Sequence, residues 1–88
     1  MRRPVYTGRF ERDLKRIKRR GKNLEKLKSI LRQLISEESL DKRYYDHPLI
    51  GNYKGRRECH IEPDGLLIYK LDQDMIIFER TGTHSDLF

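Results

Sequence analysis

The stretch RECHIEPDGLLIYKLDQDMIIFERT, residues 57–81, decides the fold because two turn signals divide it into strand-like segments. These segments span residues 57–62, 66–71 and 75–81. Proline and glycine favour a tight turn at residues 62–65, and the polar residues 72–74 favour a second one. The middle segment is almost continuously apolar, which is typical of a central, buried strand. We therefore predict a three-stranded antiparallel meander.

The first predicted strand alternates between apolar and polar side chains. Successive strand residues point to opposite faces of a sheet. Cys59 and Ile61 are therefore expected on one face. Glu58, His60 and Glu62 are expected on the other face, and Cys59 is predicted to be a small buried hydrophobe.

Two amphipathic helices are predicted before the meander. Thr7 is expected to cap a helix over residues 8–20, and Gly21 is expected to end it. A second helix is predicted over residues 23–36. Apolar residues recur at helical spacing in both: Phe10, Leu14, Ile17, Leu24, Leu27, Ile30, Leu31, Leu34 and Ile35. We expect an α-hairpin that covers one face of the sheet and turns its cations outward.

The remaining segments complete a single predicted domain, residues 1–88. Residues 4–7 are β-prone, and Pro4 has no amide hydrogen to donate, so an edge strand is expected there. Residues 36–54 show neither helical nor strand periodicity and are predicted to be a loop, which holds His47 and three tyrosines. The fold class is α+β, with the order β-α-α-β-β-β.

The charge is distributed unevenly along the 88 residues. The net charge is +6 and the isoelectric point is about 9.7. Residues 1–35 contain 13 Lys+Arg and 3 acids (net +10), whereas residues 36–88 contain 7 and 11 (net −4). Such a basic half predicts nucleic-acid binding. No apolar run is long enough to span a bilayer and none resembles a signal peptide, so we expect a cytoplasmic protein with no membrane partner.

The histidines lie among residues suited to acid–base chemistry. His60 is on a predicted strand, Asp64 is in the adjoining turn, Arg80 is on the third strand, and His47 and His84 flank this region. Such a set can cleave RNA: one group deprotonates the ribose 2′-hydroxyl, another protonates the leaving 5′-oxygen, and a cation stabilises the phosphate. Because DNA lacks that hydroxyl, RNA is the expected substrate.

Each of these residues also has a purely structural interpretation. A single strand histidine is more often a surface group, and an aspartate in a Pro-Asp-Gly turn more often shapes the turn. Arg80 is able to pair with Glu58 or Glu62 across the sheet. Phe88 is able to fill a terminal position in the core. A metal site built from the histidines and Asp64 lacks short ligand spacing, so no metal and no cofactor are predicted.

Several motifs together resemble the YafQ branch of the RelE-type toxins. They are Asp46-His47-Pro48-Leu49, Lys54-Gly55, Arg57, His60, Glu62-Pro63-Asp64, Leu67-Ile68-Tyr69-Lys70, Phe78-Glu79-Arg80-Thr81-Gly82-Thr83-His84 and Leu87-Phe88. The resemblance is dense from Asp46 to Phe88. Over the helices it rests on length, basic amphipathic pattern and element order. It implies two helices packed on an antiparallel sheet, in agreement with the order above.

The resemblance also implies a function. Members of this branch are toxins of type II toxin–antitoxin systems that cut mRNA in the ribosomal A site without a metal. It implies an active site of His47, His60, Asp64, Arg80, His84 and Phe88. The cations implied in RNA binding are Lys15, Arg16, Arg19, Arg20, Lys22, Lys26, Lys28, Lys54 and Arg57. The implied partners are a cognate antitoxin, the ribosome and mRNA, and operator DNA through the antitoxin.

One position departs from the family pattern. The family often has tryptophan where this chain has Gly65. We expect the glycine to favour the turn and to remove a surface on which a base stacks, with consequences for codon preference. Two alternatives to an RNA-cleaving toxin stay open: a non-catalytic RNA- or ribosome-binding module, and a toxin-fold corepressor that acts with an antitoxin.

Overall fold

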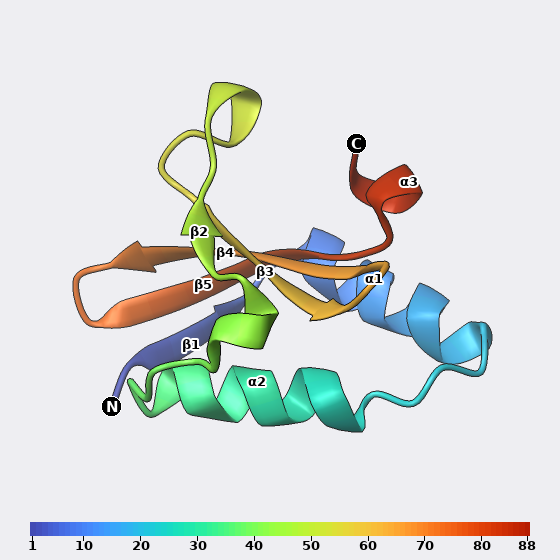
Figure 1. The fold of residues 1–88 in the computed structure, drawn as a ribbon, viewed down its shortest axis with the longest axis horizontal. Helices are drawn as coiled ribbons and strands as arrows, with labels where there is room; N and C mark the ends of the chain where they lie inside the picture. The colour runs from blue at the N-terminus through green and yellow to red at the C-terminus, as the bar shows by residue number, and fades with distance from the viewer.

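The computed structural model describes residues 1–88 as an α+β fold with a five-stranded sheet (Figure 1). The elements are β1 (Arg3–Tyr6), α1 (Gly8–Arg19), α2 (Glu25–Ile35), the 3₁₀ helix η1 (Lys42–Tyr44), β2 (His47–Pro48), the 3₁₀ helix η2 (Gly51–Tyr53), β3 (Arg57–Glu62), β4 (Gly65–Asp72), β5 (Met75–Gly82) and α3 (His84–Leu87). The strand order is β1-β5-β4-β3-β2, so the apolar strand β4 is central. The fold class and the meander β3–β4–β5 are confirmed. None of the helices is both long and apolar enough to traverse a membrane.

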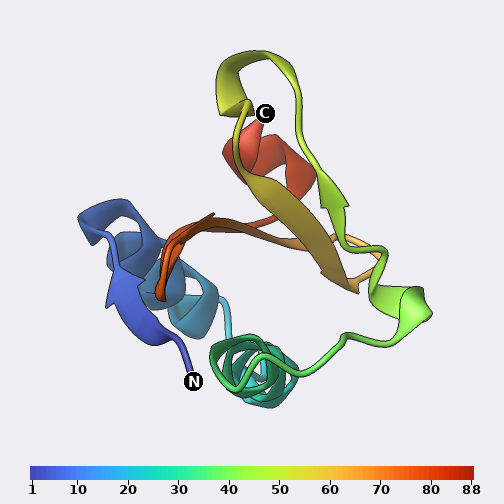
Figure 2. The same cartoon turned by 90° about the vertical axis from the view of Figure 1, so that its left-hand side faces the viewer.

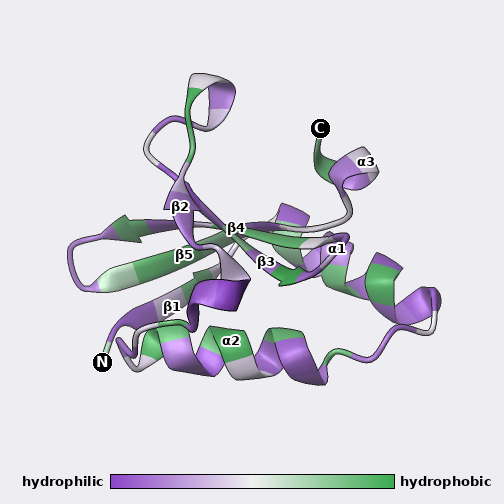
Figure 3. Ribbon diagram, in the orientation of Figure 1, coloured by the Kyte–Doolittle hydropathy of each residue, from purple (hydrophilic) through white to green (hydrophobic).

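One face of the sheet packs against both long helices. Thr7 Oγ1 accepts a hydrogen bond from the Phe10 amide at 3.1 Å, and Gly21 is left-handed (φ 76°), so both predicted ends of α1 are confirmed. In Figure 3 the apolar side of α2 is turned toward the sheet. The main core consists of Phe10, Leu27, Ile30, Leu34, Cys59, Leu67, Tyr69, Ile76 and Phe78. Burial raises the pKa of the Cys59 thiol to about 12, as suits a buried hydrophobe.

A smaller apolar cluster covers the opposite face of the sheet. Leu66 and Ile68 of β4 are fully buried there beside Leu87 of α3, and Leu49 and Tyr53 pack against them. Figure 2 shows α2 and α3 on opposite sides of the sheet. The two clusters alternate along β4, because successive strand residues point to opposite faces. Helix α3, absent from the predicted element order, is thereby fixed on the face that carries His60.

The topology departs from the prediction in three respects. First, β1 pairs with β5 in parallel, so the sheet is mixed and not purely antiparallel. Second, the segment predicted to be a loop contains η1, η2 and the edge strand β2, whose His47 and Pro48 pair with β3. Third, the long helices do not form a closely packed hairpin, since α1 packs chiefly on β5 and α2 on β3.

A β-bulge in β5 decides where Arg80 lies. Tyr69 of β4 is opposite Phe78, but Ile68 is opposite Arg80, so Glu79 is the extra residue. In a regular strand, Arg80 would share the helix-covered face with Phe78, two residues earlier. The bulge moves it to the register of Ile68 instead, and such re-aiming is a common use of bulges beside functional sites.

Candidate active site

The structure brings the three histidines together on the sheet face opposite α1 and α2. His47 comes from β2, His60 from β3 and His84 from the first position of α3. The ring centroids of His47 and His60 are 5.9 Å apart, and those of His60 and His84 are 6.2 Å apart. Asp64, in the turn between β3 and β4, lies beside His84. Residues from four segments of the sequence therefore converge on this face.

Glu58 joins this group, and the sequence analysis missed its role. Its side chain is 7% exposed, and its Oε1 atom lies 3.5 Å from His47 Nε2 and 3.3 Å from His60 Nε2. A carboxylate within reach of an imidazole nitrogen helps to fix the orientation of the ring. Period-two alternation already placed Glu58 on the face of His60. What the sequence did not reveal was that β2 would bring His47 to the same carboxylate.

The His47 ring is oriented by the backbone. Its Nδ1 atom lies 2.7 Å from the carbonyl oxygen of Tyr45. Because a carbonyl only accepts hydrogen bonds, Nδ1 carries the proton, and Nε2 faces Glu58. Tyr45 is left-handed (φ 47°), and its ring centroid is 4.5 Å from that of His47. This turn between η1 and β2 therefore sets the tautomer of the histidine.

His84 and Asp64 form a second, more exposed pair. Asp64 Oδ1 is 3.6 Å from His84 Nδ1 and accepts a long hydrogen bond from the His84 amide at 3.4 Å. More than half of each side chain is exposed. Asp64 thus lies in the predicted β3–β4 turn and also contacts a histidine. After Gly82 the chain turns back, and α3 packs on the sheet.

An aromatic surface continues from His84. The ring centroids of His84 and Phe88 are 6.2 Å apart, and Tyr53 meets Phe88 edge-on at 5.5 Å. Phe88 is 63% exposed, whereas the neighbouring Leu87 is buried. The alternative in which Phe88 plugs the core is therefore wrong. Exposed aromatic faces beside titratable groups are suited to stacking on nucleobases.

The guanidinium of Arg80 is hydrogen-bonded to Asp13 of α1. The sequence analysis did not consider Asp13. The Arg80 Nε–H donates to Asp13 Oδ2 at 2.8 Å, and this hydrogen bond raises the pKa of Arg80. Asp13 also accepts hydrogen bonds from Arg16 at 2.7 Å and from the Thr81 amide at 3.1 Å. Strand β1 ends opposite Phe78, so Thr81 has no strand neighbour on that side. The proposed pairing of Arg80 with Glu58 or Glu62 is replaced by this buried contact.

The cations that were expected to bind RNA lie in several different environments. Lys15, Arg16 and Arg19 line an open basic hollow on α1 that has no apolar lining residue. Its other lining residues are Arg9, Arg12, Asp13 and Arg80. We call this surface the α1 hollow. Arg80, which is also one of the predicted active-site residues, therefore lines the α1 hollow.

The other expected RNA-binding cations are outside the α1 hollow. Arg20 makes two hydrogen bonds of 2.9 Å to Asp86. Arg57 donates to Asp46 at 3.2 Å and is in register with Tyr69, a residue of the main core. Four lysines are exposed: Lys22, Lys26, Lys28 and Lys54. Arg57 is therefore on the face away from the histidines and does not belong to the candidate active site.

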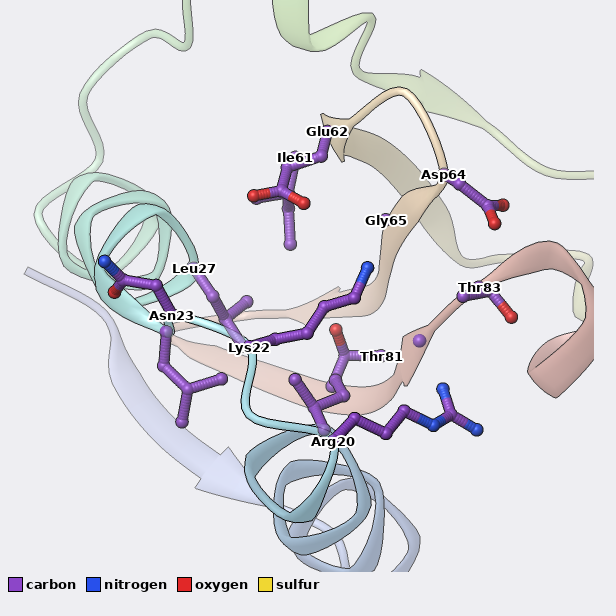
Figure 4. Close-up of a pocket in the computed structure, with 13 residues that line it drawn as sticks. Arg20, Lys22, Asn23, Leu27, Ile61, Glu62, Asp64, Gly65, Thr81 and Thr83 are labelled. Carbon is purple, nitrogen blue, oxygen red and sulfur yellow. The ribbon is translucent and has the colours of Figure 1, made fainter.

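Gly65 also lies away from the histidines, contrary to the expectation that it borders the stacking surface. It is in register with Glu62 and lines a pocket with Leu27 and Ile61, between α2 and the β3–β4 turn (Figure 4). Leu66, the next residue, points to the other face. A side chain at position 65 would enter this pocket, so the glycine leaves the aromatic surface by the histidines intact.

Comparison with known proteins identifies the family of the chain. The family described as "Bacterial toxin of type II toxin-antitoxin system, YafQ" matches residues 2–88. The chain belongs to the YafQ toxin family. The mRNA interferase toxin YafQ of Escherichia coli (strain K12) is 46% identical over 84 residues, which cover 94% of this chain and 91% of that protein.

Solved structures of YafQ-like toxins share the fold. The crystal structure of the E. coli DinJ-YafQ complex matches with a TM-score of 0.93 and 45% identity, covering 100% of this chain and 99% of that one. A metal-bound toxin from Helicobacter pylori matches with a TM-score of 0.92 and 37% identity, covering 100% of both chains. The chain therefore has the fold of the YafQ toxin family over its whole length.

Proposed function

We propose that this chain is an mRNA interferase, an endoribonuclease that cleaves mRNA in the ribosomal A site and thereby inhibits translation. The observation that supports it best is the convergence of His47, His60 and His84, with two carboxylates, on one face of the sheet. A protein that only binds RNA needs no such set of proton donors and acceptors. The name of the 46% identical E. coli relative agrees with this activity.

The geometry suits a two-step transfer of protons without a metal. One pair, His84 with Asp64, is exposed and meets the substrate from solvent. The other group, His47 and His60 around Glu58, is more buried. In the reaction, one group takes the proton of the 2′-hydroxyl, whose oxygen attacks the adjacent phosphorus, and the other protonates the departing 5′-oxygen. Either group is chemically able to act as the base while the other acts as the acid.

Arg80 and Phe88 supply the remaining interactions with RNA. The Arg80 guanidinium, oriented by Asp13, is the cation that stabilises the negative charge developing on the phosphate oxygens. Phe88, with Tyr53 against its edge, offers an exposed ring for base stacking. The cations of the α1 hollow contact ribosomal RNA phosphates.

Regulation by a cognate antitoxin belongs to the same proposal. The solved DinJ-YafQ complex shows that the E. coli relative binds an antitoxin. We extend this to the present chain and propose that its basic surface attracts an acidic antitoxin, through which the toxin reaches operator DNA. Because its substrate is on ribosomes, we place the protein in the cytoplasm.

The test is cleavage of a defined mRNA on purified 70S ribosomes, with primer extension to map the ends. The intact protein is expected to cut at in-frame codons, and His84→Ala is expected to cut about 10²–10⁴-fold more slowly, the usual contribution of one acid or base. His84 is exposed, so the fold should tolerate alanine. Ribosome binding by both proteins without any cut would instead favour the RNA-binding module. Operator binding only with an antitoxin, again without cleavage, would favour the corepressor.

A further inference from the structure

An aromatic ring lies on either side of the three histidines. The ring centroid of Tyr45 is 4.5 Å from that of His47 and 5.6 Å from that of His60. The ring centroid of Phe88 is 6.2 Å from that of His84. Tyr45 immediately precedes the edge strand β2, whereas Phe88 follows α3, which packs on β5. The two rings therefore contact different histidines and flank the group.

Both rings are exposed to a degree that the fold does not require. Tyr45 is 64% exposed and Phe88 is 63% exposed, the two highest values among the aromatic residues. Neither ring belongs to the main core or to the smaller apolar cluster, whereas Tyr44, next to Tyr45, packs against the main core. An exposed ring beside titratable groups offers its face to a nucleobase.

The backbone of Tyr45 gives a second reason to look for a role of its side chain. Its φ of 47° is in the left-handed region, which is unfavourable for a bulky residue and which glycine adopts freely. The Tyr45 amide donates to the Lys42 carbonyl at 3.0 Å, and the Tyr45 carbonyl accepts from His47 Nδ1 at 2.7 Å. Glycine would form both hydrogen bonds with less strain. Such strained residues cluster at functional sites.

The ligand that fits two rings around a set of acid–base groups is single-stranded RNA with its bases turned apart. In a regularly stacked strand the 2′-hydroxyl is not in line with the departing 5′-oxygen, so cleavage requires the two neighbouring bases to separate. Proteins hold such splayed bases by stacking them on aromatic side chains. One ring on each side would fix both nucleotides and align the phosphate between them with the histidines.

We propose that Tyr45 stacks on the base at one side of the scissile phosphate while Phe88 stacks on the base at the other side. This inference rests on the proposed function and adds a second base-binding position to it. Every nucleobase has a face on which a ring can stack, so Tyr45 contributes to the alignment of the RNA and not to the choice of base. The phenol takes no part in proton transfer.

The first experiment compares Tyr45→Gly and Tyr45→Phe in mRNA cleavage on 70S ribosomes. Tyr45→Gly should lower kcat/KM by about 5–100-fold, the usual effect of losing one stacked base, and Tyr45→Phe should stay within about twofold of the unchanged protein. Because glycine relieves the left-handed strain, Tyr45→Gly should leave Tm unchanged or raise it. We therefore expect a loss of activity without a loss of stability.

The matched control is Gln73→Gly. Gln73 is also left-handed (φ 56°) and exposed, but it lies in the β4–β5 turn, at the end of this hairpin away from His84. This substitution should not lower Tm, and it should leave cleavage unchanged. Cleavage at the unchanged rate by Tyr45→Gly overturns the proposal. An equal loss in Tyr45→Phe also overturns it, since the hydroxyl and not the ring would then matter.

The second experiment separates stacking from a purely structural role of the ring. Two synthetic mRNAs lack the base on the 5′ side or on the 3′ side of the cleaved bond. Tyr45→Gly should cause no further loss of kcat/KM on one of these mRNAs, and Phe88→Ala should cause none on the other, because each pair then lacks the same contact. An equal loss in Tyr45→Gly on the intact and both abasic mRNAs would show that the ring only supports the histidines.

Two further outcomes are decisive. Coupling of Tyr45 and Phe88 to the same base contradicts the placement of one ring on each side. If the unchanged protein cuts intact mRNA and Tyr45→Gly cuts it equally fast, the stacking role fails and the proposed function stands. If the unchanged protein cuts no mRNA on ribosomes, the proposed function fails and the stacking role fails with it.

Discussion

Asp13 shows how one buried side chain connects a helix to the candidate active site. It is 2% exposed and accepts hydrogen bonds from Arg16, Arg80 and the Thr81 amide. An isolated carboxylate at this depth is unfavourable unless cations and donors satisfy it. The same contacts fix the guanidinium of Arg80, so this carboxylate both joins α1 to β5 and orients a residue at the site.

Removing this carboxylate should destabilise the fold strongly. We expect Asp13→Ala to lower the free energy of unfolding by about 3 kcal/mol or more, because two guanidiniums lose their buried partner. Urea unfolding of the two proteins measures the difference. The control is Glu11→Ala, which removes an exposed acid from the same helix and should change stability by less than about 0.5 kcal/mol. Equal losses from the two substitutions would contradict the role given to Asp13.

Gly65 is a position where a larger side chain should stabilise the fold. A Cβ atom there would be 3.5 Å from the Glu62 Cβ, an ordinary contact, and the backbone is not left-handed. Alanine would also reduce the freedom of the unfolded chain, so Gly65→Ala should add about 0.4–1 kcal/mol to the free energy of unfolding. This corresponds to a rise of a few degrees in Tm by calorimetry.

The matched control is alanine at another glycine of the same sheet. Gly82 has φ +151°, and a Cβ there would be 2.9 Å from Asp86 Oδ2. Gly82→Ala should therefore lower Tm. If Gly65→Ala also lowered Tm, the pocket beside α2 would not accept a side chain and its description would be wrong.

The residues of the site differ in how far the sequence predicted them. The opposite orientations of Cys59 and His60 follow from strand alternation alone, and the structure confirms them. Glu58 was placed on the correct face, but its contact with His47 depends on the two-residue pairing of β2 with β3. Asp13 resembled a solvent-exposed helix acid, because its partner Arg80 is 67 residues away in the sequence.

At the scale of elements, α3 is a short helix that begins with a capping box. Thr83 Oγ1 accepts from the Asp86 amide at 3.2 Å, and Asp86 Oδ2 accepts from the Thr83 amide at 3.0 Å. Asp86 also binds Arg20 of the chain after α1 through two hydrogen bonds. This reciprocal capping box positions His84, the first residue of the helix.

The Asp86 contacts predict a dependence of stability on pH. Hydrogen bonds from Arg20 and then from the Thr83 amide hold the pKa of Asp86 well below its usual value. A lowered pKa in the folded state stabilises the protein above the unfolded pKa of about 3.9, and this contribution is lost as pH falls toward the folded value. We therefore expect Asp86→Asn to be less stable than the unchanged protein at pH 7.

The difference in the free energy of unfolding between these two proteins should shrink as pH is lowered below about 4, because the unchanged protein then loses the same contribution. Urea unfolding at pH 7, 4 and 3 measures it. A difference that stays constant across this range would assign the stability to the shape of the side chain and not to its charge.

Elements with a strong hydrophobic periodicity were predictable from the sequence. Elements defined only by their pairing with another strand were not. The three meander strands and both long helices lie within a few residues of their predicted ranges. Strand β2 has two residues, one of them Pro48, so no period exists to detect. The bulge at Glu79 likewise leaves no signal in one sequence, because it appears only in the register between β4 and β5.

At the scale of the whole molecule, part of the excess positive charge of the N-terminal half is concentrated on one surface, the α1 hollow. Arg12, Lys15 and Arg19 line the α1 hollow and form no ion pair with an acidic residue. Arg16 of the same surface is used internally, since it binds Asp13. Cations without internal partners are free to neutralise phosphates, whereas those already paired contribute less to RNA binding.

This distribution predicts which cations set the affinity for ribosomes. Joint replacement of Arg12, Lys15 and Arg19 by glutamine should remove up to three phosphate contacts, so the slope of log affinity against log salt should fall by about 2–3. Binding to 70S ribosomes between 50 and about 200 mM salt measures the slope. The matched control replaces three exposed cations outside the predicted RNA-binding set, Arg32, Lys42 and Arg43, by glutamine, with the same change in net charge. If the α1 hollow contacts RNA, only the α1 variant changes the slope; equal changes in both would mean that net charge, and not this surface, sets the affinity.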